Sequence, residues 1–142
     1  MSEQKPSETS YKTMEQAAMG GFAKVMMSNQ YKTAEFAFWV IVKANGGQLS
    51  FHYLTPQTDG SAHGVSLVMP HGFMIRAYCH THPGSLKTEH FSPDDLQEFT
   101  RLREINPIIS FFLLTPYDQI RIAQNEKEFQ VSRSVQWLRV KP

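Results

Sequence analysis

The first part of the chain shows hydrophobic residues at helical spacing. Between residues 13 and 29 the apolar positions fall three or four apart, which predicts an amphipathic helix: Met14, Ala17, Ala18, Phe22, Val25 and Met26. Gly20 and Gly21 lie in the middle of this helix, and a glycine pair is expected there only if another group packs closely against it. Residues 1–12 carry no periodic apolar pattern, so we expect a flexible tail.

Alternating and β-branched residues then predict four strands: residues 34–44, 49–53, 65–69 and 73–79. The first two flank a turn at Asn45-Gly46-Gly47, which is typical of a hairpin. Residues 55–63 are predicted to form a polar loop. Pro70-His71-Gly72 separates the last two strands.

The second half of the chain continues with a helix and two strands. Ser92 is a strong N-cap, followed by a proline and two acidic residues, so a helix is predicted from Ser92 to the residue before Pro107. The continuous apolar run at residues 108–114 is typical of a buried central strand, and residues 119–123 alternate as its neighbour would. Residues 126–140 are expected to close the domain as a helix or a strand.

The order of these elements predicts the fold class. A helix, four strands, a helix and two strands pack as an α/β or α+β sandwich around a mixed sheet. A chain of 142 residues suits one hydrophobic core, so residues 13–142 are expected to form a single domain.

Composition and charge narrow the function classes. The 14 Lys and Arg residues against 13 Asp and Glu residues give a net charge of +1 with no basic stripe, so no nucleic-acid partner is expected. The longest apolar run, residues 36–42, is too short to span a membrane, and the polar N-terminus lacks the apolar stretch of a secretory signal. We therefore expect a cytoplasmic protein with no membrane partner, while signal-independent secretion and the oligomeric state stay open.

A single cysteine restricts the metal chemistry. With Cys79 alone, an intramolecular disulfide and a cysteine-based zinc site are both excluded. Strand alternation turns Cys79 away from the face of its neighbour His80, so it is expected to be a small buried residue. Any metal must therefore be held by histidines and carboxylates.

His80 and His82 form a candidate pair of metal ligands at the end of a strand. Residues two apart on a strand point to the same face, about 6.6 Å apart at a rise of roughly 3.3 Å per residue. Two imidazoles can converge on one zinc ion from these positions. Pro83 and Gly84 then end the strand, so the pair lies at the rim of the sheet, where a site can open to solvent.

Three further residues complete the candidate site. A catalytic zinc takes three protein ligands and leaves a position for water, and Asp95, in the first turn of the predicted helix, is the best third ligand. Ser92 then lies beside the metal with its hydroxyl available to a developing oxyanion. Glu35 is an isolated acid at the start of an apolar strand, which suggests a general base.

Each of these features also has a simpler explanation. Residues 92–95 make a good helix N-terminus without any chemistry, paired histidines on a strand are often incidental, and Glu35 alone fits the solvated start of a strand. The combination of paired histidines, a proline stop and Ser-x-x-Asp ten residues later favours a site. Metallo-β-lactamase-like, histidine-triad, cupin and TIM-barrel amidohydrolase sites fit the residues or the chain length less well, and a zinc deaminase would need a cysteine pair.

The sequence resembles the JAMM, or MPN-plus, zinc metalloprotease family. That family's motif consists of an upstream Glu, then His-x-His-Pro, a variable loop and Ser-x-x-Asp, which match Glu35, residues 80–83 and residues 92–95. Residues 78–82 and 89–95, Tyr-Cys-His-Thr-His and Glu-His-Phe-Ser-Pro-Asp-Asp, are similar to a bacterial branch of uncharacterised or toxin-associated domains.

The resemblance implies a fold and a chemistry. The fold would be an α/β/α sandwich of cytidine-deaminase-like type. Zn²⁺ would be held by His80, His82 and Asp95, with Glu35 activating the water and Ser92 stabilising the oxyanion. The activity implied is zinc-dependent cleavage of a peptide or isopeptide bond in a protein or peptide substrate, either as a toxin or effector or as a housekeeping enzyme.

Two departures from the family pattern and one alternative function remain. The gap between the histidines and the serine is longer than usual, so residues 84–91 are expected to carry their own specificity. Phe36 and Phe38 replace small residues after the Glu, which alters the expected substrate groove. The alternative is a non-catalytic MPN-like scaffold that binds a protein partner through its sheet and the region of Trp137.

Overall fold

The computed structural model describes residues 3–84, 89–129, 133–137 and 140–142. Over these residues the regular elements follow one another in this order: α1 (Met14–Met26), β1 (Phe36–Asn45), β2 (Gln48–Tyr53), β3 (Gln57–Thr58), β4 (Met74–Thr81), α2 (Pro93–Ile105), β5 (Ser110–Leu114), β6 (Ile120–Ala123), the 3-10 helix η1 (Glu126–Phe129) and β7 (Arg133–Val135).

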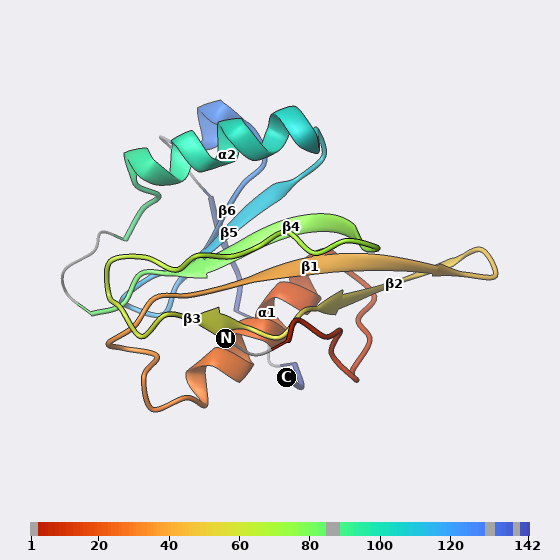
Figure 1. The fold of residues 1–142 in the computed structure, drawn as a ribbon, viewed down its shortest axis with the longest axis horizontal. Coiled ribbons are helices and arrows are strands. Elements are labelled where there is room, and N and C mark those ends of the chain that lie inside the picture. The colour runs from red at the N-terminus through yellow and green to blue at the C-terminus, as the bar shows by residue number, and fades with distance from the viewer. Residues whose placement is uncertain (1–2, 85–88, 130–132, 138–139) are drawn as a thin grey trace.

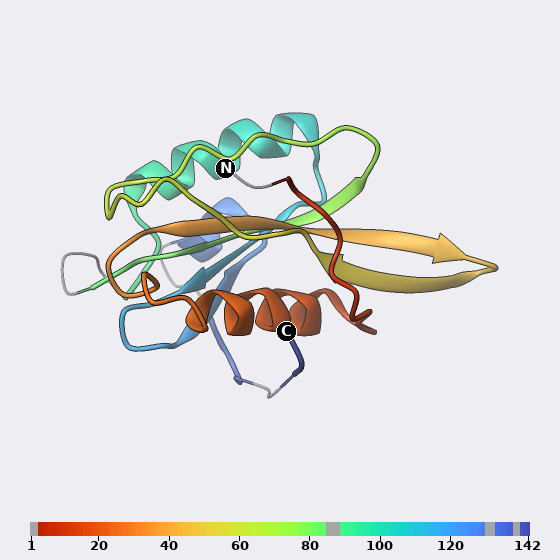
Figure 2. The ribbon, with the colours of Figure 1, turned by 60° about the horizontal axis from the view of Figure 1, so that its bottom comes forward.

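The strands form one mixed sheet of seven strands in the order β2-β1-β4-β5-β6-β7, and β3 pairs with the start of β1. Neighbouring strands are antiparallel except β4 and β5, which run parallel and are connected through α2. A parallel pair requires such a crossover. α1 covers one face of the sheet and α2 the other (Figures 1 and 2). The predicted α/β class with a mixed sheet is confirmed.

Each face of the sheet has its own hydrophobic core. Side chains alternate along β1, so Phe38 and Val40 pack on the α1 side while Trp39 and Ile41 pack on the α2 side. All five residues of β5 are buried, as predicted for a central strand. Cys79 is a free cysteine buried in the α1-side core, which confirms the prediction for it.

The glycine pair in α1 marks a close approach between that helix and its surroundings. A Cβ atom on Gly21 would overlap the ring of Phe38, and a Cβ atom on Gly20 would overlap the side chain of Tyr11. The close packing that was expected at this glycine pair is therefore present. It lets the first helix lie directly against β1.

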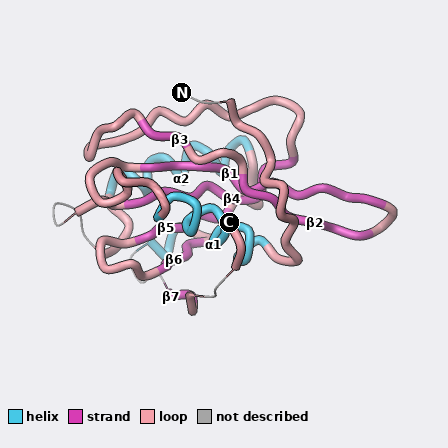
Figure 3. Tube along the Cα trace, turned by 90° about the horizontal axis from the view of Figure 1, so that it is seen from below, coloured by secondary structure: helices cyan, strands magenta, loops and turns pink. Residues whose placement is uncertain are grey.

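The expected flexible tail is wrong for residues 3–12, which pack along the outer edge of β2. Tyr11 exchanges two backbone hydrogen bonds with Phe51, at 2.9 and 2.8 Å. The buried Tyr11 side chain donates from its hydroxyl to the carbonyl of Lys141, and the C-terminus lies over α1 (Figures 2 and 3). A short segment that pairs with a strand elsewhere carries no periodic signal of its own. By covering β2 it protects an edge strand that would otherwise be open.

The strand predicted at residues 65–69 is also wrong, and the predicted loop at residues 55–63 contains β3. β1 already pairs with β2 and β3 along one side and with β4 along the other, so neither edge of β1 is left for residues 65–69. Side chains, and not a neighbouring strand, supply hydrogen bonds to the backbone of this segment. Trp39 Nε1 and Gln4 Nε2 both donate to the carbonyl oxygen of Val68, at 3.1 and 2.8 Å. Leu67 and Met69 of this segment pack against the α2-side core.

The end of the chain contains both a helical turn and a strand. η1 covers the α2-side core through Phe129, and β7 pairs with β6 at the far edge of the sheet. The prediction for residues 126–140 left these two options open. Within the part of the chain that the structure describes, no helix has the length and apolar character needed to cross a bilayer.

Candidate metal centre

Three segments that are far apart in the sequence meet at one end of the sheet. The last residues of β4, the start of β1 and the first turn of α2 lie together at the left of Figure 1. This follows from the topology, since β4 and β5 are parallel and α2 must return over the sheet from the end of one strand to the start of the next. The first turn of α2 therefore lies above the end of β4.

His80, His82 and Asp95 converge in this region. His80 Nε2 lies 3.0 Å from Asp95 Oδ1, and His82 Nε2 lies 3.2 Å from Asp95 Oδ2. One ligand atom from each residue falls within 4.8 Å of the others, which is a spacing that a single metal ion can bridge. The side chains of His80 and His82 are 1% and 4% exposed, and that of Asp95 is 15% exposed, so the group is accessible from the carboxylate side.

The His80 ring is buried with its polar atoms poorly satisfied. Both of its ring nitrogens are buried, and neither makes a hydrogen bond of acceptable geometry with any described residue. The 3.0 Å separation from Asp95 is thus a close charge contact and not a well-formed hydrogen bond. Buried polar atoms without partners are rare and costly. A metal ion on Nε2 would satisfy this nitrogen, and two imidazoles with one carboxylate are a donor set that suits zinc.

His80 and Asp95 each favour the ionised form of the other. Burial by itself would lower the pKa of His80, but the nearby carboxylate of Asp95, with a contribution from Glu35, raises that pKa above its usual value. Burial by itself would raise the pKa of Asp95, but the nearby charge of His80, together with hydrogen bonds from His82 and from the Ser92 backbone, holds that pKa far below its usual value. Asp95 is therefore ionised and ready to bind a cation.

Asp95 is held in place by the start of α2. The backbone N–H of Ser92 donates to Asp95 Oδ2 at 2.7 Å, and the Ser92 hydroxyl oxygen accepts from the backbone N–H of Asp95 at 3.1 Å. This reciprocal pair is a capping box, and it is built on Ser92, the predicted N-cap. It leaves the Ser92 hydroxyl hydrogen available to another acceptor. The geometry is thus compatible with Ser92 as a helix cap alone and with Ser92 as a cap that also donates to an oxyanion.

Glu35 lies directly before β1, on the same face of the sheet as the histidines. His80 pairs with Ala37 across β1 and β4, and continuing that antiparallel register by two positions brings Glu35 opposite His82. The backbone of Glu35 is fixed on both sides: its N–H donates to Ser61 at 2.8 Å, and its carbonyl accepts from the Thr58 hydroxyl at 2.7 Å. All five residues predicted for the site therefore lie at the same end of the sheet.

Thr81 contributes to the site in a way that the sequence analysis missed. It lies between the two histidines on β4 and is buried, and its hydroxyl oxygen accepts a hydrogen bond from the backbone N–H of Phe36 at 3.0 Å. This contact fixes the start of β1, and hence Glu35, relative to the histidines. Only the pairing of β1 with β4 reveals that role.

A cavity of about 450 Å³ opens beside this group. It lies between the first half of α2 and the segment before β4, and it is lined by Glu35, His63, Gly64, Val65, Ser66, Leu67, Val68, Tyr78, His82, Ser92, Asp94, Asp95 and Glu98. The predicted base, oxyanion donor and two of the predicted ligands thus face one space. The segment at residues 63–68, Tyr78 and Glu98 had no chemical signal in the sequence, because only the fold brings them to the cavity.

Tyr78 forms part of the wall nearest the histidines. Its ring packs against Trp39 and Phe111, with ring centroids 5.3 and 4.8 Å away. Burial, with the negative charges of Glu35 and Asp95 nearby, raises the pKa of Tyr78 far above its usual value. The phenol therefore stays protonated and neutral in the folded protein.

The loop at residues 84–91 is described only in part, because residues 85–88 lie outside the described residues. Glu89 is tied to the β5–β6 connection, since its carboxylate accepts from the backbone N–H of Tyr117 at 2.8 Å and its carbonyl accepts from Arg121 Nε at 2.6 Å. Glu89 is therefore engaged away from the metal-ligand group. His90 is exposed.

The sequence matches no protein-family model and no curated protein sequence. The chemistry of the site then follows from its own groups: two imidazoles and a carboxylate around one point, a second carboxylate on the same face, and a hydroxyl at a helix N-terminus.

Proposed function

We propose that this protein is a zinc-dependent hydrolase of the JAMM type that cleaves a peptide or isopeptide bond. The observation that carries the proposal is the convergence of His80, His82 and Asp95 beside a cavity that Glu35 and Ser92 also line. These residues come from three separate segments, and a helix cap or an incidental histidine pair would not require them to meet.

The ligand set supports zinc as the cofactor. His80, His82 and Asp95 would hold the ion, and the buried, unpartnered nitrogens of His80 favour a bound cation over an empty polar cluster. A zinc ion held by three protein groups supplies Lewis acidity that lowers the pKa of a water molecule toward about 7.

Glu35 and Ser92 are assigned the remaining roles. The Glu35 carboxylate accepts a proton from the attacking water and returns it to the leaving nitrogen, so the products are a carboxylic acid and an amine. The Ser92 hydroxyl, whose oxygen already accepts from Asp95, donates its hydrogen to the oxygen of the scissile carbonyl as negative charge develops there. A donor of this kind contributes roughly 10²–10³ in rate.

The arrangement of the fold supports the same family. A mixed sheet with one helix on each face and the ligands at the end of a parallel strand is what an α/β/α sandwich of cytidine-deaminase-like, JAMM/MPN type would have. The substrate proposed is accordingly a protein or a peptide.

A non-catalytic scaffold is the alternative function. Trp137, which that role would use, is 37% exposed. A scaffold has no need, however, for a buried histidine with unpartnered nitrogens beside an ionised carboxylate. We therefore favour the enzyme.

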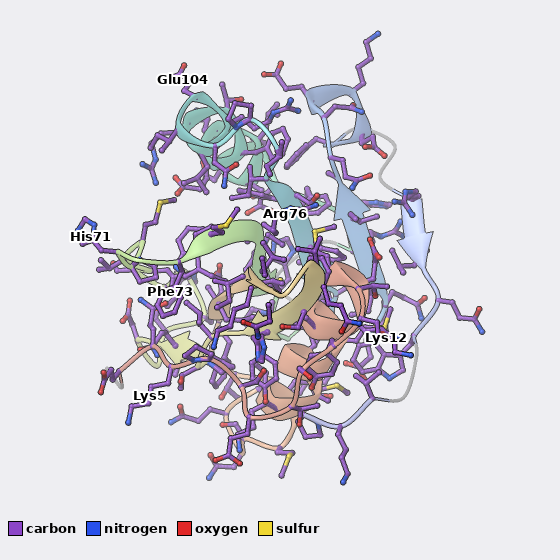
Figure 4. All side chains as sticks on the ribbon, turned by 90° about the vertical axis from the view of Figure 1, so that its right-hand side faces the viewer. Lys5, Lys12, His71, Phe73, Arg76 and Glu104 are labelled. Carbon is purple, nitrogen blue, oxygen red and sulfur yellow. The ribbon has the colours of Figure 1, made fainter. Side chains whose placement is uncertain are left out.

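The test combines metal content with turnover. Protein purified without chelators is analysed for zinc, and the zinc-loaded protein is incubated with a pool of linear and lysine-branched peptides, with new termini identified by mass spectrometry. We expect about one zinc per chain, hydrolysis by the wild type, and no hydrolysis by Glu35→Gln with its zinc retained. Glu104→Gln is the matched control, because Glu104 is exposed on the outer side of α2 and lines no part of the cavity (Figure 4). Wild-type turnover by Glu35→Gln would refute the assignment of the base, and absence of zinc would refute the function.

A further inference from the structure

We propose that the cavity selects substrates carrying a lysine or arginine side chain next to the scissile amide, with Glu98 and Asp94 as the specificity-determining residues. This inference rests on the proposed function, since it concerns the same site. The cavity adjoins a metal-ligand group in which His80 is buried without a hydrogen-bond partner, so a ligand is expected there on grounds independent of charge.

The charged residues of the cavity are almost all of one sign. Glu35, Asp94, Asp95 and Glu98 line it, and no lysine or arginine is found among the described lining residues. A bound divalent cation would offset two of these four negative charges. Because Glu35 and Asp95 are already committed to proton transfer and metal binding, Asp94 and Glu98 are the carboxylates left to contact a substrate.

Asp94 and Glu98 each have a structural role in α2, but their geometry leaves both carboxylates accessible to a ligand. Asp94 lies in the first turn of α2, where an acid interacts favourably with the helix dipole, but an exposed acid there is equally able to face a ligand. Glu98 forms an ion pair with Arg101, at 2.5 Å. The Arg101 side chain is 60% exposed and that of Glu98 is 38% exposed, so Arg101 approaches from solvent and screens Glu98 only in part.

The opposite wall of the cavity contains three apolar side chains among polar ones. Val65, Leu67 and Val68 line it from the segment before β4, together with His63, Gly64 and Ser66, and this segment crosses alongside α2 in Figure 2. Val68 is held there by the hydrogen bonds that its carbonyl accepts from Trp39 and Gln4. Apolar side chains facing an acidic wall match the long alkyl stem and charged end of a lysine or arginine side chain.

The experiment uses zinc-binding hydroxamates as probes. In one series, Nα-acetyl hydroxamates of lysine, norleucine and glutamate place the side chain on the carbonyl side of the scissile position. A malonyl hydroxamate series places the same side chains on the amine side. Dissociation constants for the zinc-loaded full chain are measured by calorimetry. In at least one series we expect lysine to bind about five- to tenfold more tightly than norleucine, as one or two partly exposed ion pairs would give, and glutamate to bind most weakly.

Substitutions test whether Glu98 and Asp94 produce the preference for lysine over norleucine. Glu98→Gln and Asp94→Asn should each reduce the lysine-to-norleucine ratio, and the double variant should abolish it while norleucine affinity stays unchanged. Arg101→Gln should increase the ratio because it removes the competing cation, and Glu104→Gln should leave it unaltered. Raising the salt concentration should weaken the lysine preference alone.

The outcomes separate the two proposals. Tight hydroxamate binding with equal affinities for lysine and norleucine in both series overturns the specificity and leaves the zinc hydrolase standing. A lysine preference that survives in the double variant also overturns the roles of Glu98 and Asp94. Failure of the protein to bind zinc, or of any hydroxamate to bind the zinc-loaded chain, overturns the proposed function and this inference with it.

Discussion

Asp95 accepts a hydrogen bond from the backbone N–H of Ser92, at 2.7 Å, through the same oxygen that lies 3.2 Å from His82 Nε2. The cap of α2 and the candidate metal group therefore share one carboxylate. A capping box fixes the position of its acidic side chain, so the helix N-terminus holds Asp95 in a defined position toward the histidines. This pre-organisation lowers the conformational cost of metal binding.

Removing the metal should destabilise the protein. An ion that binds only the folded state raises the free energy of unfolding by about 2.7 kcal/mol at a concentration 100 times its Kd. Adding zinc to the metal-free protein should raise the melting temperature of the wild type, and a chelator should reverse the change. His82→Ala should not respond, while His71→Ala should behave as wild type because His71 is exposed and points away from the body of the molecule (Figure 4). An equal response from His82→Ala would place the ion elsewhere.

The cap and the metal group can be separated by two substitutions. Asp95→Asn keeps an oxygen that accepts from the Ser92 N–H but loses the negative charge, so zinc binding should be lost while the cap is retained. Ser92→Ala removes the acceptor for the Asp95 N–H and should cost about 1 kcal/mol of unfolding free energy, with zinc still bound. Denaturant unfolding and metal analysis of both variants check the pair. Zinc retained by Asp95→Asn would show that this carboxylate is not a ligand.

Close packing at Gly21 should make that position intolerant of a methyl group. Gly21→Ala places a Cβ into the ring of Phe38, which is fully buried, so overpacking should cost about 1–3 kcal/mol despite the better helix propensity of alanine. Phe38→Leu gives up part of that ring, and the double variant should lose less than the two single losses combined. Chemical denaturation of all four proteins tests this. Additive losses would mean that the two positions do not contact each other.

The N-terminal segment should contribute to stability although its sequence resembles a tail. Tyr11→Ala removes a buried aromatic side chain that packs on Gly20, and the loss should be on the order of 3 kcal/mol. Deleting residues 1–11 should have at least as large an effect. Lys12→Ala is a suitable control, because Lys12 is exposed. Unchanged unfolding of the truncated protein would restore the interpretation as a flexible tail.

Alkaline pH should weaken the fold through Tyr53. Burial, with a smaller contribution from Tyr11, raises the pKa of Tyr53 to about 12, from a usual value near 10. A raised pKa contributes stability that is complete below pH 10 and is lost as the pH rises toward 12. The unfolding free energy of Tyr53→Phe should therefore fall less steeply over this window than that of the wild type, with the same slope at neutral pH. Identical slopes above pH 10 would contradict the assignment.

Local patterns in the sequence were sufficient for much of the fold. Helical spacing placed α1, the turn at Asn45-Gly46-Gly47 placed the hairpin of β1 and β2, and the N-cap at Ser92 placed the start of α2. These features depend on neighbouring residues, so they can be predicted without knowing what they pack against. Residues 65–69 show the limit, because their alternation suited a strand but both edges of β1 were already paired with other strands.

The candidate site likewise depends partly on local sequence patterns and partly on tertiary contacts. Local sequence patterns identify the residue types of the site, namely two histidines on one strand face, a capping carboxylate, a hydroxyl and an isolated acid. The tertiary structure decided that they meet, because the β4–α2–β5 crossover returns Asp95 over His80 and the register of β1 with β4 brings Glu35 opposite His82. It alone also supplied Thr81, which fixes Glu35 to the histidines, and the acidic and apolar side chains that line the cavity. These depend on contacts such as those of Asp95 with His82 and of Thr81 with Phe36, which are 13 and 45 positions apart and which no local pattern encodes.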